Sequence, residues 1–127
     1  MGDISTNEEQ FQALADNSDE GPFVMLNLLK FKESGGREAY LRYVQEANPY
    51  VAGVGAKVIY SGKANELVGG DQTWDAVMLV EYPSRRAFLQ MASDPGYLKA
   101  HAHRVQALER AVLYATDPMP MRTILSG

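Results

Sequence analysis

The chain has 127 residues, of which 46% are hydrophobic and 22% are charged, proportions that suit one globular domain with a single core. Its formal charge of -4 and its lack of cysteine exclude a basic nucleic-acid-binding protein, a disulfide framework and a thiolate or cysteine–metal site. No apolar run reaches the roughly 20 residues that a membrane-spanning helix needs, and the first residues lack the pattern of a signal peptide. We therefore predict a cytoplasmic protein.

The first segment is acidic. Residues 1–20 contain six of the 16 acidic residues and no Lys or Arg. Within this segment, Phe11 and Leu14 have the spacing of one helix face, and Asn7 is a suitable N-cap. We assign residues 1–21 to an acidic N-terminal helix and the turn that follows it.

The next two elements are a buried strand and a helix. Residues 23–31 carry apolar side chains on both alternating faces, which indicates a strand that is covered on both sides. The Ser-Gly-Gly sequence at 34–36 interrupts it, and a helix is predicted from Arg37. Pro49 is expected to end or kink that helix.

A hairpin of two unequal strands is predicted next. Residues 56–68 are half polar, a pattern typical of an edge strand, and Gly62 marks a bulge. Residues 74–82 are apolar on both faces and so predict a second central strand.

The last predicted elements are two helices, a strand and a tail. Ser84 is the N-cap of the first helix, and the Asp-Pro sequence at 94–95 starts the second, which is expected to run to about residue 112. Residues 113–116 predict the last strand. Prolines at 118 and 120 predict an extended tail over residues 118–127.

The order over residues 22–117 is strand–helix–strand–strand–helix–strand, which predicts a ferredoxin-like α+β domain. In that arrangement the first and third strands are central, and these are the two strands that are apolar on both faces. Helices cover only one face of such a sheet, so the other apolar face needs a separate cover. We expect a second copy packed sheet to sheet, and hence a homodimer.

Several segments of this domain form a set that is fairly specific when taken together. The set consists of Asn27-Leu28-Leu29-Lys30-Phe31, Tyr40 and Tyr43, Val80-Glu81-Tyr82-Pro83-Ser84, Phe88, Asp94-Pro95-Gly96-Tyr97 and Arg104. It resembles the dimeric α/β-barrel superfamily and, within it, the branch known as domain of unknown function family 1330. The resemblance implies a homodimer whose two sheets form a barrel, with a ligand site between sheet and helices. Relatives include cofactor-free monooxygenases, lactone isomerases and haem enzymes, so the fold does not set the activity.

Asn27 is the first candidate site residue, because a buried amide in the middle of an apolar strand must be hydrogen-bonded. It either anchors a ligand carbonyl or bonds to neighbouring backbone. Tyr97, His101 and Arg104 share one helix face by their spacing. Arg104 is suited to hold a carboxylate or enolate, and His101 to move a proton near neutral pH.

Each of these residues also has a structural interpretation. For Arg104, an ion pair with Glu81 or Asp75 is favoured about two to one over a role in ligand binding, since buried charges are usually paired. His101 is more simply a partly exposed surface histidine.

Four aromatic residues are candidate substrate-binding residues, as walls and hydrogen-bond donors for a flat ligand. They are Tyr43, Tyr60, Trp74 and Tyr97. The alternative for most of them is an ordinary core or dimer interface.

No metal and no cofactor is expected, because His101 and His103 lie about 200° apart around a helix and no glycine-rich phosphate loop is present. The sequence thus predicts a homodimer with a small aromatic or carbonyl ligand, and neither nucleic acid nor membrane as partner. The catalytic candidates are Asn27, Arg104 and His101, for a cofactor-free monooxygenation or isomerisation. The alternative is a non-catalytic ligand-binding or structural dimer, so the sequence leaves open whether the protein is an enzyme.

Overall fold

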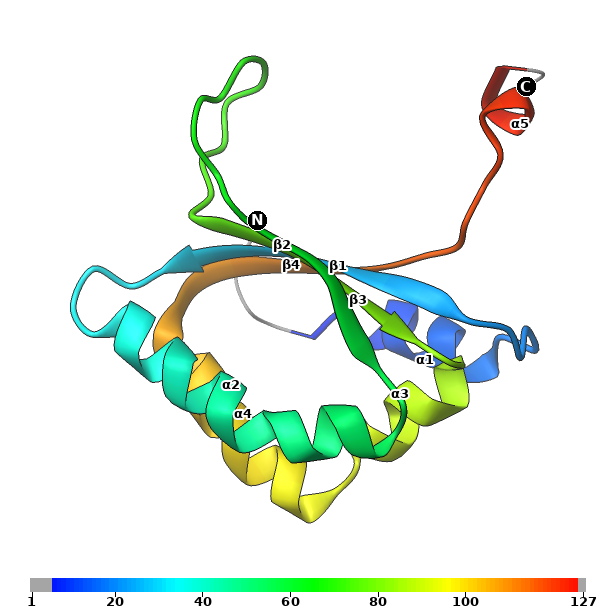
Figure 1. Cartoon of the computed structure of the whole chain (residues 1–127), viewed down its shortest axis with the longest axis horizontal. Coiled ribbons are helices and arrows are strands. Elements are labelled where there is room, and N and C mark those ends of the chain that lie inside the picture. The colour runs from blue at the N-terminus through cyan, green and yellow to red at the C-terminus, as the bar shows by residue number, and fades with distance from the viewer. Residues whose placement is uncertain (1–5, 126–127) are drawn as a thin grey trace.

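The computed structural model describes residues 6–125, so the first five residues of the predicted acidic segment and the last two of the predicted tail lie outside the described residues. Figure 1 shows one sheet with a layer of helices on one side. The elements in chain order are α1 (Glu8–Asp16), β1 (Phe23–Phe31), α2 (Gly36–Gly53), β2 (Lys57–Lys63), β3 (Ala76–Tyr82), α3 (Arg85–Ala92), α4 (Pro95–Ala107), β4 (Leu108–Thr116) and α5 (Met121–Leu125).

The four strands form one antiparallel sheet in the order β2-β3-β1-β4. The predicted ferredoxin-like α+β order is confirmed, with the two strands of continuous apolar sequence, β1 and β3, at the centre. The single chain forms an open sheet and not a closed barrel.

The core lies between this sheet and helices α2, α3 and α4. Residues of β1 alternate between buried and half-buried, with Phe23, Met25, Asn27 and Leu29 on the helix-facing side. The buried residues separate into two clusters, one around Phe23 and the other around Leu29. Tyr43 and Met78 pack against both clusters and so mark the boundary between them.

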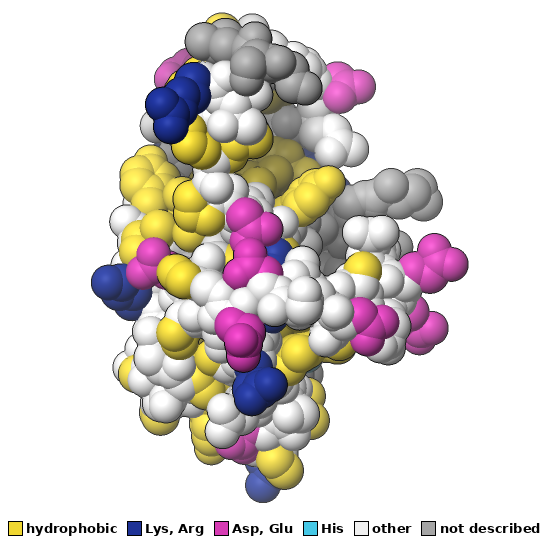
Figure 2. Space-filling model, turned by 90° about the vertical axis from the view of Figure 1, so that its right-hand side faces the viewer, with side chains coloured by type: hydrophobic (Ala, Val, Ile, Leu, Met, Phe, Trp, Pro, Cys, Tyr) yellow, Lys and Arg dark blue, Asp and Glu magenta, His cyan; other side chains and the backbone are white. Residues whose placement is uncertain are grey.

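The opposite face of the sheet is apolar and has no helix over it (Figure 1). Cross-strand partners share a face, so the register places Leu26 beside Leu79 of β3 and Tyr114 of β4 on this side. Figure 2 shows hydrophobic side chains gathered in the upper part of the molecule, on the side away from the helical layer. We call this surface the open face.

Three elements differ from their sequence-based predictions. α4 ends at Ala107 and β4 begins at once, because pairing with β1 overrides the helical pattern of residues 108–112. α2 does not end at Pro49 but continues through it to Gly53. The tail is not extended throughout: Met121–Leu125 forms a helical turn after Pro120, whose carbonyl accepts a hydrogen bond from the Thr123 amide at 2.9 Å.

No helix among residues 6–125 is both long and apolar enough to cross a bilayer.

Candidate functional site

Arg104 is a buried cation without a counter-ion. It lies on the side of α4 that faces the sheet, and its side chain is 92% buried, since only 8% remains exposed. Its Nη2 atom is buried and has no hydrogen-bond partner. Within residues 6–125, no ion pair joins Arg104 to a carboxylate. Buried charges are normally paired, so this arrangement requires an explanation.

The predicted pairing of Arg104 with Glu81 or Asp75 is wrong. Glu81 lies on the open face and forms its ion pair with Lys57 of β2, at 3.6 Å. Asp75 lies at the end of the hairpin and is within 4 Å of Lys30 and Arg37. Both carboxylates are therefore engaged elsewhere, and the sheet alternation places Glu81 on the side opposite to α4.

Four buried tyrosines lie near enough to Arg104 to interact electrostatically with its positive charge. Tyr40 and Tyr43 come from α2, Tyr82 from β3 and Tyr97 from α4. The hydroxyls of Tyr43 and Tyr97 share a hydrogen bond of 2.8 Å, and the ring centroids of Tyr40 and Tyr43 are 5.3 Å apart. Arg104 lies close enough to Tyr40 to interact with its hydroxyl. We call these four residues and Arg104 the tyrosine–arginine cluster.

All four phenols hold their protons at neutral pH. Burial raises the pKa of Tyr40 to about 12, although the positive charge of Arg104 acts in the opposite direction. Burial also raises the pKa of Tyr43, Tyr82 and Tyr97 above the ordinary value. The cluster thus combines one positive charge with neutral hydroxyl groups, which are the donors that an oxyanion would accept from.

Asn27 lies on the helix-facing side of the central strand and is 7% exposed. Its amide nitrogen donates to the carbonyl of Met25 in the same strand at 3.4 Å, which is a long hydrogen bond. Its neighbour in β3 is Met78, at the boundary between the two core clusters. Asn27 therefore brings a weakly bonded amide into the same layer as the tyrosine–arginine cluster.

His101 stands one helical turn before Arg104 on α4 and is half-buried. Its ring centroid is 6.0 Å from that of Tyr97. Burial, and then the positive charge of Arg104, lower the pKa of His101 below its ordinary value of 6.5. The imidazole is consequently neutral at pH 7 and can accept a proton.

This shift predicts a pH-dependent stability that belongs to His101. Because the folded-state pKa is below the unfolded value, the unfolded chain takes up the proton first as the pH falls. The stabilisation is thus fully present above pH 6.5 and is lost as the pH drops through the lowered pKa. We expect the free energy of unfolding of His101→Gln to change less between pH 7.5 and pH 5 than that of the wild type, measured by urea denaturation. Equal slopes for the two proteins would contradict this assignment.

Two of the predicted aromatic residues lie away from the cluster. Tyr60 is on the open face and 56% exposed, because a bulge between Val58 and Tyr60 reverses the alternation of β2. Trp74 lies at the base of the β2–β3 hairpin, where the guanidinium of Arg110 stacks on its ring at 4.5 Å. Of the seven predicted site residues, the structure brings five into the layer between sheet and helices: Asn27, Tyr43, Tyr97, His101 and Arg104.

Tyr40 and Tyr82 belong to the aromatic residues that the sequence offers as a ligand wall, but they are not among the seven predicted site residues. Both carried a usable signal, since Tyr40 is three residues before Tyr43 on α2 and Tyr82 shares the buried face of β3 with Val80. No local sequence pattern predicts the neighbouring cleft, because its lining residues come from three separate elements, α2, β2 and β3.

A cleft of about 360 Å³ opens beside the cluster, between the first turn of α2 and strands β2 and β3. Its rim includes the cations Arg37 and Lys63 and the carboxylate of Asp75. Its floor includes Ala76 and Met78, which also pack against the core cluster that holds Tyr40. Met78 therefore separates this cleft from the tyrosine–arginine cluster.

No group of three His, Asp or Glu side chains among the described residues is arranged to hold a metal ion.

Comparison with known proteins yields a family match and several similar structures. The family model described as "Domain of unknown function (DUF1330)" matches residues 28–117. The crystal structure of RPA0582, a protein of unknown function from Rhodopseudomonas palustris, is 35% identical to this chain, with a TM-score of 0.88 over 94% of this chain and 99% of RPA0582. No curated protein gives a significant match.

Two more distant structures share the fold. A dimeric ferredoxin-like protein of unknown function from Jannaschia is 12% identical, with a TM-score of 0.65 over 77% of this chain and 100% of its own. A protein from Caulobacter crescentus, provisionally named an antibiotic biosynthesis monooxygenase, is 14% identical, with a TM-score of 0.59 over 80% of this chain and 92% of its own.

Proposed function

The chain belongs to the DUF1330 family, and on that premise we propose that it is a homodimer whose subunits each bind a small aromatic or carbonyl compound beside Arg104. The observation that carries the proposal is the guanidinium of Arg104, which is buried without a carboxylate partner and has an unbonded Nη2 atom. An anionic ligand oxygen at this point would supply the missing counter-charge.

The surroundings of Arg104 favour a ligand that forms an enolate or phenolate. The neutral tyrosine hydroxyls and the amide of Asn27 can donate hydrogen bonds to a ligand, and they carry no negative charge that would pair with Arg104 in its place. The tyrosine rings also match the shape of a flat ligand. A ligand with an acidic C–H or O–H next to a carbonyl would become more acidic at this site, because its anion is stabilised by Arg104 and Asn27.

The proposed chemistry is proton transfer at carbon without a cofactor. The neutral imidazole of His101 takes the proton from the ligand carbon, the electron pair moves to the carbonyl oxygen, and Arg104 and Asn27 hold the resulting enolate. Return of the proton to a different carbon completes an isomerisation. Where dioxygen adds to the enolate carbon and that carbon carries a second hydrogen, the resulting hydroperoxide loses water. The CH2 group then becomes a carbonyl, its two C–H bonds supply all the electrons, and one oxygen atom enters the ligand while the other leaves as water, which is a monooxygenation. The name of the Caulobacter neighbour is consistent with this second course.

The cleft beside α2 supplies the route by which a ligand reaches Arg104. It has a volume of about 360 Å³ and is widely open to solvent, so it is suited to be an entrance and not an enclosed binding site. Arg37 and Lys63 line its rim, and Asp75 is already neutralised by Lys30 and Arg37, so the rim attracts anions. Met78 has to change rotamer for the ligand to pass, and methionine does this readily.

The open face supports the homodimer. Leu26, Leu79 and Tyr114 lie side by side on a sheet face that no helix covers. A continuous apolar sheet surface of this kind is typical of an interface. The structural neighbour from Jannaschia is dimeric, and it has the same fold.

A direct binding measurement tests the ligand proposal. We expect wild-type protein to bind a hydroxyquinone or an arylpyruvate saturably in isothermal titration calorimetry, with affinity rising as the pH crosses the pKa of the ligand. Asn27→Leu, which keeps the side-chain volume but removes the amide, should weaken binding by roughly tenfold. The exposed variant Leu98→Ala is the matched control and should bind as the wild type does. Absence of binding for every anionic probe would overturn the proposal.

A non-catalytic ligand-binding protein is the second candidate, and the close packing of the cluster favours it. Tyr43 is hydrogen-bonded to Tyr97 and packs against Tyr40, so three of the four tyrosines are already joined by direct contacts. Saturable binding of the same compounds, with no change in their absorption or mass and no dioxygen uptake over hours, would establish this second function in place of the first.

A further inference from the structure

The C-terminal arm, which we define as residues 118–125, leaves the body of the protein on the side of the open face. Figure 1 shows it projecting from one end of the sheet, away from the helical layer, while the β2–β3 hairpin projects on the same side from the other end. Met119 and Met121 of the arm are 55% and 66% exposed. An arm with apolar side chains in water indicates that its partner surface lies outside the single chain.

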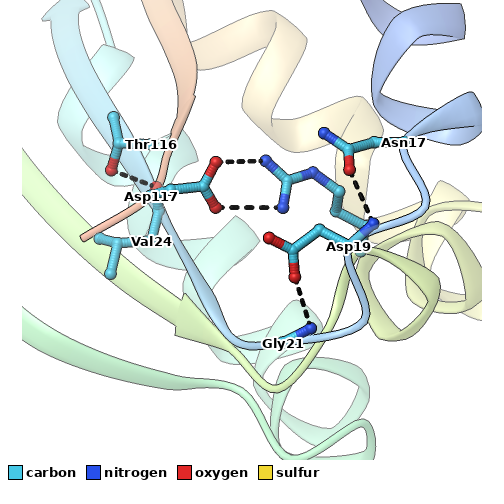
Figure 3. Close-up of polar contacts among 7 residues, drawn as sticks. Asn17, Asp19, Gly21, Val24, Thr116 and Asp117 are labelled. Carbon is cyan, nitrogen blue, oxygen red and sulfur yellow. Dashed lines mark hydrogen bonds and ion pairs between the residues drawn. The ribbon is translucent and has the colours of Figure 1, made fainter. Parts of the chain in front are cut away.

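The root of the arm is fixed. Asp117, the last residue before it, accepts two hydrogen bonds from the guanidinium of Arg85, at 3.1 and 3.0 Å (Figure 3). Arg85 is itself buried, at 6% exposure, and its guanidinium stacks on the ring of Phe23 at 4.9 Å. The hydroxyl of Thr116 donates to the carbonyl of Val24 at 2.8 Å, which holds the end of β4 against β1.

The direction of the arm is thereby set before a partner arrives. Pro118 and Pro120 restrict the backbone that follows the fixed root, so the arm loses little conformational entropy when it docks. The bidentate ion pair with the buried Arg85 fixes where the arm starts and the direction in which it leaves. Such a fixed start is suited to an arm that docks at one particular surface.

A small hollow lies at the base of the β2–β3 hairpin, formed by residues 64–75 and the start of β3. Its volume is about 180 Å³, and Leu67, Trp74 and Val77 contribute its apolar lining. Val77 is on the open face, because its neighbour in β1 is Leu28. The hollow is smaller than the roughly 300 Å³ at which small-molecule sites begin, but it suits one or two side chains.

We propose that the arm of each protomer crosses to a second copy of this chain and seats Met119 and Met121 in the hollow beneath that copy's hairpin. This inference rests on the proposed homodimer. When two copies pack open face to open face, a two-fold axis across the strands brings each arm opposite the partner's hairpin, because arm and hairpin stand at opposite ends of the sheet. Methionine fills irregular apolar gaps and makes favourable contacts with an aromatic ring, here that of Trp74.

The test uses the full chain, the double variant Met119→Ser/Met121→Ser and the control Leu98→Ser, an exposed leucine on α4. Sedimentation equilibrium gives the dissociation constant of the dimer, and the fluorescence of Trp74, the single tryptophan, reports on the hollow. We expect the double variant to weaken the dimer by roughly tenfold to a hundredfold. At concentrations where both proteins are dimeric, its tryptophan emission should be shifted to the red of that of the wild type. The control should match the wild type in both readouts.

The outcomes separate the two proposals. A wild type that stays monomeric at every concentration would overturn the homodimer itself. A dimeric wild type, with a double variant that dimerises as tightly and emits at the same wavelength, would overturn the arm while the homodimer stands. A weakened dimer with unchanged emission would also overturn the proposal, because the arm would then bind somewhere other than beneath the hairpin.

Discussion

Arg104→Met is expected to weaken the binding of an anionic carbonyl ligand by roughly a hundredfold or more, while the protein stays as stable as the wild type to within about 1 kcal/mol. Methionine is unbranched and reproduces the aliphatic part of the arginine side chain as far as Nε, so most of the packing between α4 and the sheet is retained. It removes a buried charge that lacks a counter-ion, which offsets the lost contact with the hydroxyl of Tyr40. Titration calorimetry gives the affinity, and urea denaturation gives the free energy of unfolding.

Arg85→Met is the matched control, because Arg85 is equally buried and also has one unbonded nitrogen, Nε, but its charge is paired with a carboxylate. Its guanidinium makes two hydrogen bonds to Asp117 and stacks on Phe23. Its loss should lower the free energy of unfolding by about 1–3 kcal/mol, since Asp117 is half-exposed and regains water, and it should leave ligand affinity unchanged. If Arg104→Met behaved like Arg85→Met, with lost stability and no effect on binding, Arg104 would be a structural residue.

Arg85 and Arg104 have similar surroundings in the sequence. Each is a basic residue at the inner position of an amphipathic helix, and a rule that buried charges are paired applies to both. The structure separates them: α3 presents Arg85 to a carboxylate, whereas α4 presents Arg104 to four neutral phenols. Which arginine is left without a counter-ion depends on the fold, and therefore could not be read from spacing.

The fold was predicted well where a sequence pattern has a single physical cause, such as burial of a strand or the period of a helix. β1 and β3 are apolar on both faces because helices cover one face of the sheet and the other is the open face. This pattern identified them as the central strands. The helix face of Tyr97, His101 and Arg104 followed from a period of 3.6 residues, which tertiary packing does not alter within one helix.

Features set by pairing between distant segments could not be predicted in the same way. Residues 108–112 read as helix but join β4, because β1 offers an unpaired edge. Tyr60 reads as a partner of Val58 on one face, but the single extra residue of the bulge turns it to the open face. For that reason Tyr60, a predicted site residue, lies away from the tyrosine–arginine cluster.

The polar layer of the core lowers stability but supplies the groups that the proposed ligand site would use. Asn27 and Arg104 lie where the two apolar clusters join, and Tyr43 and Met78 contact both clusters. An all-apolar core would be easier to stabilise, since each buried polar group needs a partner. A layer of under-bonded polar groups beside a cleft is what a ligand site requires before the ligand arrives.

Leu26→Lys is expected to convert the proposed homodimer into a folded monomer, weakening association by at least about a hundredfold. Leu26 lies at the centre of the open face, between Leu79 and Tyr114, so two-fold packing would bury a lysine of each protomer without a counter-ion. The single chain tolerates the change, because Leu26 points away from the core and is only half-buried there.

Sedimentation equilibrium measures the mass, and circular dichroism shows that the monomer remains folded. Leu41→Lys, an exposed leucine on α2, is the control and should remain dimeric. If Leu26→Lys is as dimeric as this control, the interface is not the open face, and the hydrophobic side chains of that face need another partner. If it is monomeric yet still binds the carbonyl ligand, each subunit holds a complete site between its own sheet and helices, which is what the position of Arg104 within one chain predicts.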